Sequence, residues 1–167
     1  MYLGKKEYIS TNQNLEEKYS EIAQKDEKSA KILEREGLYN QAAYFYIQSM
    51  EKYIKSNIAK KINLTNQYFA DEMRKTMGHS IDGALELLLK VYTVNNPTLE
   101  KHMKEQLLDG ILQNTRFKAL NNILRYPIYN PKSESYTFSE LTKEDCQTLN
   151  SMLSQLKRYL TELVRIK

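Results

Sequence analysis

The N-terminal part of the chain has apolar residues at three- and four-residue steps, with one longer interval. Within residues 14–36 these positions are Leu15, Tyr19, Ile22, Ala23, Ala30 and Leu33. Lysines and glutamates fill the opposite face, so the pattern predicts an amphipathic helix. We expect Gly37 to end this helix, because glycine readily adopts the left-handed conformation that follows a helix.

The next segment, residues 41–61, carries a wider apolar surface. Its apolar residues include Ala42, Ala43, Phe45, Tyr46, Met50, Tyr53, Ile54 and Ile58. A helix with so wide an apolar surface has to be covered on several sides, so we predict that it is the central helix. Asn40 has a residue type that often caps a helix, and we expect it to cap this one.

Further helices follow the same reasoning. Tyr68, Phe69 and Met73 predict one short helix within residues 63–78. Ser80 is expected to cap a helix with Asp82 in its first turn. The apolar face of that helix comprises Ile81, Ala84, Leu85, Leu88, Leu89 and Tyr92. Pro97 suits the first turn of the next helix, which extends over residues 99–124 with an interruption expected near Gly110.

The segment 125–141 contains two prolines and several serines, so we predict an extended loop rather than a linker between domains. Thr142 is expected to cap the last helix. Its periodic positions are Cys146, Leu149, Met152, Leu153, Leu156, Tyr159, Leu160 and Leu163.

Composition supports this view. The chain has 167 residues with only five glycines and three prolines, which favours long helices over many short strands. We predict an all-α protein, a single-domain antiparallel bundle of four to six helices. The domain is expected to span residues 1–167, with a core at about residues 12–165.

Other features limit the classes of function. The single cysteine, Cys146, lies on an apolar helical face and is expected to be a buried, inert thiol, in keeping with a reducing cytoplasm. No apolar segment is long enough to span a membrane, so we expect a cytoplasmic protein without membrane association. His102 has no second histidine or cysteine at ligand spacing, so we expect no metal and no cofactor. The net charge of +4 permits contact with phosphates.

Three segments, in this order and spacing, resemble the HEPN domain family. They are GLYNQAAYFYIQSMEKYIKSNIA (residues 37–59), GHSIDGALELL (78–88) and RYPIYN (125–130). The resemblance covers roughly residues 30–163. It implies a bundle of four or five helices that often forms a homodimer. It also implies a neighbouring nucleotidyltransferase, in a toxin–antitoxin or phage-defence pair, and an association with nucleotides or RNA.

Many HEPN proteins are ribonucleases whose signature is an arginine followed four to six residues later by a histidine. Arg74 and His79 have this spacing, so the resemblance implies that they are a catalytic pair. An imidazole can accept the proton of the 2′-hydroxyl while a guanidinium stabilises the charge at phosphorus. A cap, a dimer contact or a nucleotide contact remains open for His79.

Two further groups of residues suit phosphate binding. Lys52 and Lys55 form a basic patch on the central helix with Lys60 and Lys61, extended by Arg74 and Lys75. Either phosphate binding or a solvated helix face explains this patch. Arg125 can hold a phosphate and Tyr126 can stack on a base. Alternatively, both lock the loop against the bundle.

Three functions therefore compete. The first is a binding and regulatory HEPN protein that dimerises and acts with a nucleotidyltransferase. The second is a metal-independent ribonuclease toxin using Arg74 and His79. The third is a repeat-type scaffold, because residues 27–54 resemble one tetratricopeptide unit, although no second copy follows about 34 residues later.

Overall fold

The computed structural model describes residues 12–62 and 80–163, and residues 4, 8, 66, 67, 70 and 71. Its helices are α1 (Asn12–Arg35), α2 (Tyr39–Lys61), α4 (Ile81–Thr93), α5 (Pro97–Lys104), the π-helix η1 (Glu105–Ile111), α6 (Phe117–Ile123) and α7 (Lys143–Leu163). Two short strands, β1 (Ile128–Asn130) and β2 (Ser135–Thr137), form a hairpin. The all-α prediction is confirmed.

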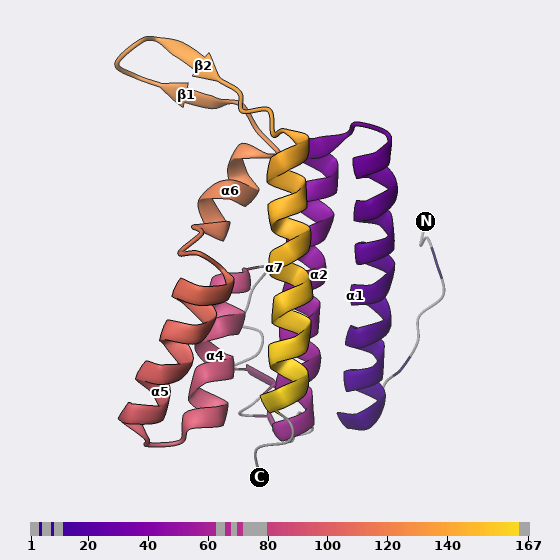
Figure 1. Ribbon diagram of the computed structural model, residues 1–167, viewed down its shortest axis with the longest axis vertical. Helices are drawn as coiled ribbons and strands as arrows, with labels where there is room; N and C mark the ends of the chain where they lie inside the picture. The colour runs from indigo at the N-terminus through magenta and orange to yellow at the C-terminus, as the bar shows by residue number, and fades with distance from the viewer. Residues whose placement is uncertain are drawn as a thin grey trace.

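Helix α2 is central, as its wide apolar surface predicts. It packs against α1, α7 and α4, and Figure 1 shows α1, α2 and α7 aligned lengthwise. Its buried apolar residues are Ala42, Ala43, Tyr46, Ile47, Met50, Ile54, Ile58 and Ala59. All of these except Ala59 belong to one core cluster with the apolar faces of α4 and α7. A single shared core distinguishes these helices from a stack of repeated helix pairs.

The turn between α1 and α2 follows from Gly37. Its φ of +76° lies in the left-handed region, where glycine has no steric penalty. The Leu38 N–H donates to the Leu33 carbonyl at 2.9 Å, and the Gly37 N–H donates to the Glu34 carbonyl at 3.1 Å. These two bonds form a Schellman motif, which ends α1 where the sequence predicts.

The prediction that Asn40 caps α2 is wrong. Helix α2 begins at Tyr39, so Asn40 already lies inside its first turn. Its amide instead reaches the segment before α7, where Nδ2 donates to the Ser139 carbonyl at 2.9 Å and Oδ1 accepts from the Leu141 N–H at 2.8 Å. Asn40 therefore ties the start of α2 to the start of α7.

Two other predicted caps differ in outcome. Ser80 occupies the cap position of α4, but its side chain makes no capping hydrogen bond. Thr142 does cap α7, because its Oγ1 accepts from the Asp145 N–H at 3.3 Å. The Asp145 carboxylate accepts in return from the Thr142 N–H at 2.8 Å, which completes a reciprocal capping box.

The region from α5 to α6 is interrupted shortly after Gly110, as expected. Asn96 caps α5 by accepting from the Leu99 N–H at 3.0 Å, and Pro97 occupies the first turn. The π-helix η1 then ends at Ile111, and Gln113 and Asn114 adopt positive φ values of 50° and 53°. This left-handed pair redirects the chain, so α6 begins at Phe117 in a new direction.

The segment 125–141, predicted as an extended loop, contains the β1–β2 hairpin. Ile128 pairs with Thr137, Tyr129 with Tyr136, and Asn130 with Ser135. All six strand residues are exposed. Strands of three residues without a buried face leave little alternation in the sequence, which is why the pattern predicts only a loop.

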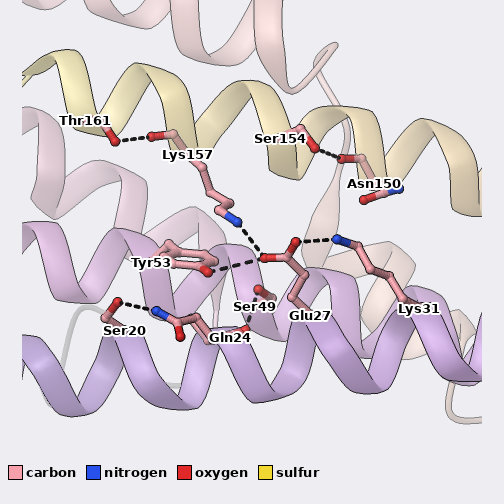
Figure 2. Close-up of polar contacts among 11 residues, drawn as sticks. Ser20, Gln24, Glu27, Lys31, Ser49, Tyr53, Asn150, Ser154, Lys157 and Thr161 are labelled. Atoms are coloured by element: carbon pink, nitrogen blue, oxygen red, sulfur yellow. Dashed lines mark hydrogen bonds and ion pairs between the residues drawn. The ribbon is translucent and has the colours of Figure 1, made fainter.

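A polar cluster joins α1, α2 and α7 on one side of the bundle (Figure 2). The Glu27 carboxylate of α1 accepts from Lys157 of α7 at 2.7 Å and from Lys31 at 2.6 Å. The Tyr53 hydroxyl of α2 donates to the same carboxylate at 3.3 Å. Three helices therefore meet at one anion.

Candidate functional site

The two residues of the predicted catalytic pair, Arg74 and His79, lie outside the described residues. The described chain resumes at Ser80, the residue that follows His79 in the sequence. The catalytic assignment of this pair therefore stays a prediction.

Lys52 and Lys55 are both engaged in ion pairs. Lys52 contacts Asp26 of α1 at 2.6 Å, and Lys55 contacts Glu51 at 2.5 Å. Lys55 is only 8% exposed. Lys60 of the same run lies 3.1 Å from Glu16 of α1. The structure thus places much of this predicted patch against carboxylates, so its charge is largely compensated within the bundle.

Arg125 and Tyr126 lie at the start of the segment that leads to the hairpin. Arg125 Nη2 donates to the Tyr126 hydroxyl at 2.9 Å. The guanidinium lies over the Tyr126 ring at 5.0 Å and over the Tyr44 ring of α2 at 5.9 Å. These contacts hold Arg125 in place by cation–π attraction. They do not neutralise its charge.

Arg125 lines a groove between the start of α4 and α6, here called the α4–α6 groove. Two adjoining hollows of about 590 and 470 Å³ form it, and both include Asp82, Phe117, Lys118 and Asn122. Buried Phe117, with Leu85 and Leu112, provides an apolar floor. Ser80, where the described chain resumes, lines one hollow.

Local geometry explains how the groove forms. The left-handed pair Gln113 and Asn114 turns the chain toward α4. Phe117 then inserts into the core, where it is 1% exposed. The Asp82 carboxylate accepts from the Lys118 backbone N–H at 3.2 Å, which fixes the first turn of α6 beside the first turn of α4.

Three cations and two carboxylates, Asp82 and Glu86, line the groove. Arg116, Lys118 and Arg125 are exposed lining residues. Within residues 12–62 and 80–163, no ion pair involves any of the three, whereas Lys52, Lys55, Lys60 and Lys157 are all paired. Guanidinium and ammonium groups without a carboxylate partner are suited to an anion.

Asn121 adds a hydrogen-bonding group to the same groove. Its Oδ1 atom is buried and makes no hydrogen bond in the described part of the chain. A buried acceptor without a partner is costly unless a ligand or water supplies a donor. An apolar floor, cations and a free amide oxygen together fit a ligand with a planar polar group and a phosphate.

Sequence reasoning missed Arg116, Lys118 and Asn121. The available signal was the pair of cations on either side of Phe117, directly after the break in the helical pattern. That signal is weak, because cations near a helix start are common on solvated surfaces.

A separate hollow of about 360 Å³ lies where α2, α4, α5 and α7 meet, at the far end of α2 from Asn40. It includes His102, Tyr92 and Tyr159. Burial raises the pKa of Tyr92 to about 12, and the nearby Glu16 adds to this rise. Across the described ranges, no three histidine, cysteine or acidic side chains gather as metal ligands would.

Among the helices that the structure describes, none combines the length and apolar character required to cross a bilayer.

Comparison with known proteins agrees with the fold. No curated protein and no solved structure matches the chain. A model of the HEPN domain matches residues 16–163, a range that includes the described helices from α2 to α7 and most of α1. On this match and on its all-helical bundle, the chain belongs to the HEPN domain family.

Proposed function

We propose that this protein binds a nucleotide or RNA in the α4–α6 groove and acts as a binding and regulatory HEPN protein. The observation that carries the proposal is the gathering of Arg116, Lys118 and Arg125, unpaired within the described residues, around an apolar floor. Family membership supports a role with nucleotides or RNA.

Each group has a distinct task in this proposal. The two arginines bind phosphate oxygens through their forked donors, and Lys118 adds a point charge. Leu108 and Ala119, apolar lining residues that are not buried, give a nucleobase an apolar surface, and Asn121 Oδ1 accepts from an amino group of the base. In this proposal Lys52 contributes indirectly, by holding the central helix against α1 through Asp26, and Lys55 pairs with Glu51 within the central helix itself.

The proposal extends to partners. HEPN domains often dimerise, and we infer a homodimer that acts with a nucleotidyltransferase in a toxin–antitoxin or phage-defence pair in the cytoplasm. Size measurement of the protein alone and with a neighbouring nucleotidyltransferase tests this part. A protein that stays monomeric and does not bind the nucleotidyltransferase would contradict it.

A ribonuclease activity is the second candidate. The observation that favours it is the place of Ser80 in the groove, because Arg74 and His79 precede Ser80 in the sequence. In that case the groove cations position the RNA, and the arginine–histidine pair cleaves it. Loss of RNA cleavage in both Arg74→Ala and His79→Ala, with binding retained, would support this activity.

The groove is tested by charge reversal. The variant carries Arg116→Glu, Lys118→Glu and Arg125→Glu, and binding of labelled single-stranded RNA and of ATP is measured by fluorescence anisotropy. The control carries Lys28→Glu, Lys90→Glu and Lys143→Glu, three exposed lysines elsewhere with the same change of net charge. We expect the groove variant to lose at least about tenfold in affinity and the control to lose far less. Equal losses of affinity in the groove variant and the control would show that the groove is not the binding site.

A further inference from the structure

The β1–β2 hairpin exposes an unusual amount of apolar surface. The exposed side chains of this segment are Tyr126 (55%), Ile128 (46%), Tyr129 (49%), Tyr136 (72%) and Phe138 (52%). They are half of the exposed large apolar side chains that the structure describes. Figure 1 shows the hairpin projecting beyond the end of the bundle. Such a concentration is typical of a surface that contacts a partner.

The hairpin also lacks support from the bundle. Its two strands pair only with each other, and none of their six residues is buried. A two-stranded hairpin of this kind is at best marginally stable in water. Tyr129 and Tyr136 stand opposite each other with ring centroids 5.2 Å apart, which leaves one broad aromatic face uncovered. Additional strands would stabilise both the backbone and this face.

The two edges of the hairpin differ. Pro127 and Pro131 flank β1, and proline has no N–H to donate to a neighbouring strand. Strand β2 is flanked by Glu134 and Phe138, which both have a backbone N–H to donate. Neither strand contains a charged residue or a proline, the features that normally protect an edge from pairing. The outer edge of β2 is therefore the open one.

We propose that β2 pairs antiparallel with β2 of a second copy of this chain and forms a four-stranded sheet across a two-fold axis. This inference rests on the homodimer of the proposed function and adds the surface that forms it. In the symmetric register, Tyr136 faces the partner's Tyr136, and Ser135 faces the partner's Thr137. Aromatic pairs and hydroxyl pairs opposite each other both stabilise antiparallel strands. The register brings no like charges together within the strands.

Charge favours a second copy over RNA as the occupant. Residues 126–141 contain one cation, Lys132, and two carboxylates, Glu134 and Glu140. A surface that binds RNA through stacked tyrosines also needs cations along the phosphates. Here the cations lie in the α4–α6 groove instead, so the aromatic face of the hairpin fits a neutral protein surface better.

The expected dimer is weak, because three residues per strand bury a small area. Interfaces below roughly 1,200 Å² are usually transient. The mass of the wild-type protein in solution should therefore rise from monomer toward dimer as its concentration increases. Sedimentation velocity over a range of concentrations measures this directly.

Two matched variants locate the interface. Tyr136→Glu and Tyr129→Glu each remove one ring of the same pair and add one carboxylate to the hairpin. Only Tyr136→Glu places two carboxylates opposite each other at the two-fold axis, where like charges repel. We expect Tyr136→Glu to weaken dimerisation at least about tenfold more than Tyr129→Glu. Circular dichroism checks that both variants fold.

A charge-complementation experiment completes the test. Tyr136→Lys alone should also be monomeric, and a mixture of Tyr136→Glu with Tyr136→Lys should form a heterodimer. A wild type that stays monomeric, equal effects of the two glutamate variants, or no heterodimer would overturn the proposal. Loss of RNA binding by Tyr136→Glu without a change in mass would also overturn it, in favour of an RNA-stacking face. Nucleotide binding in the α4–α6 groove should be unchanged in Tyr136→Glu. A failure of the dimer proposal can therefore be told apart from a failure of the proposed nucleotide site.

Discussion

Lys157 of α7 donates a hydrogen bond to Glu27 of α1 at 2.7 Å, across 130 positions of the chain. The Glu27 carboxylate is 14% exposed and also binds Lys31 and the Tyr53 hydroxyl (Figure 2). Helix α1 has its main packing against α2. The Glu27 contacts therefore provide a direct link between the first and last helices of the described bundle.

Replacing Glu27 with glutamine should lower the free energy of unfolding by about 1 kcal/mol, because two lysines lose a partly buried anion. Urea unfolding at neutral pH measures the change. Glu21→Gln is the control, since Glu21 also binds two lysines but is 47% exposed in side-chain area. An equally large effect of both substitutions would contradict the special role of Glu27.

The ion pair between Glu27 and Lys157 predicts that the stability of the fold depends on pH. Burial acts to raise the pKa of Glu27, but hydrogen bonds from Lys157 and Lys31 outweigh it, so the pKa is lowered from its ordinary value of 4.5. A lowered pKa stabilises the fold above pH 4.5, and this contribution is lost as the pH falls through the lowered pKa.

The pKa of Lys157 determines where the contribution of this ion pair to stability ends at alkaline pH. Burial acts to lower its pKa, but the hydrogen bond to Glu27 outweighs this, and the pKa is raised above 10.5. Its contribution is therefore present below pH 10.5 and lost as the pH rises through the raised pKa. The difference in unfolding free energy between the wild type and Glu27→Gln should be constant near neutrality and shrink in acid, as the pH falls through the lowered pKa of Glu27. A difference that persists in acid would contradict the ion-pair explanation.

Asn40→Ala should destabilise the junction between the hairpin and α7. It removes the two hydrogen bonds to Ser139 and Leu141, and we expect a loss of about 1–2 kcal/mol. Hydrogen exchange at the Leu141 amide gives a local readout, and this amide should exchange faster in the variant. Gln41→Ala, at an exposed neighbouring position, should leave that exchange unchanged. Unaltered exchange in Asn40→Ala would show that the amide does not hold the segment.

Cys146 should resist thiol reagents in the folded protein. Its side chain is fully buried, and its Sγ–H donates to the Tyr39 carbonyl at 3.3 Å. Burial, followed by the charges of Glu34 and Asp145, raises the pKa of the thiol to about 11. Titration with a disulfide reagent at about pH 8 should be slow until urea is added. A cysteine introduced at the exposed Ser151 should react at once, and rapid reaction of Cys146 itself would contradict its burial.

The α4–α6 groove predicts a specific salt dependence for single-stranded RNA. Each phosphate contact contributes about 0.7 to the slope of log affinity against log salt concentration. Neutralising Arg125 alone, as Arg125→Gln, should lower the slope by about this amount. The triple groove variant should lower it by about 2. An unchanged slope in the triple variant would place the phosphates elsewhere.

Local signals were enough to predict several elements. The three- and four-residue period identifies the buried face of α7 from Cys146 to Leu163, because a helix repeats every 3.6 residues. Gly37 and Thr142 act within a few residues of their positions, so their roles as helix stop and cap are readable from the chain alone. The central place of α2 follows from the width of its apolar surface, which one neighbouring helix cannot cover.

Contacts between distant segments could not be read in this way. The helical period places Lys52 and Lys55 near each other, but only the packing of α2 on α1 pairs Lys52 with Asp26. Asn40 has a residue type typical of a cap, yet its partners Ser139 and Leu141 lie about a hundred positions later. Side-chain type states what a residue can bind, whereas the tertiary fold decides which partner is within reach.

The sequence by itself therefore determined the helical class, the core faces and the family resemblance, because these depend on the order and spacing of residues along the chain. Only the tertiary structure brought Arg116, Lys118 and Arg125 to one groove and left the hairpin tyrosines uncovered. The physical reason is the change of direction at Gln113 and Asn114. These two left-handed residues set where α6 begins relative to α4, whereas the hairpin tyrosines stay uncovered because their strands pair only with each other.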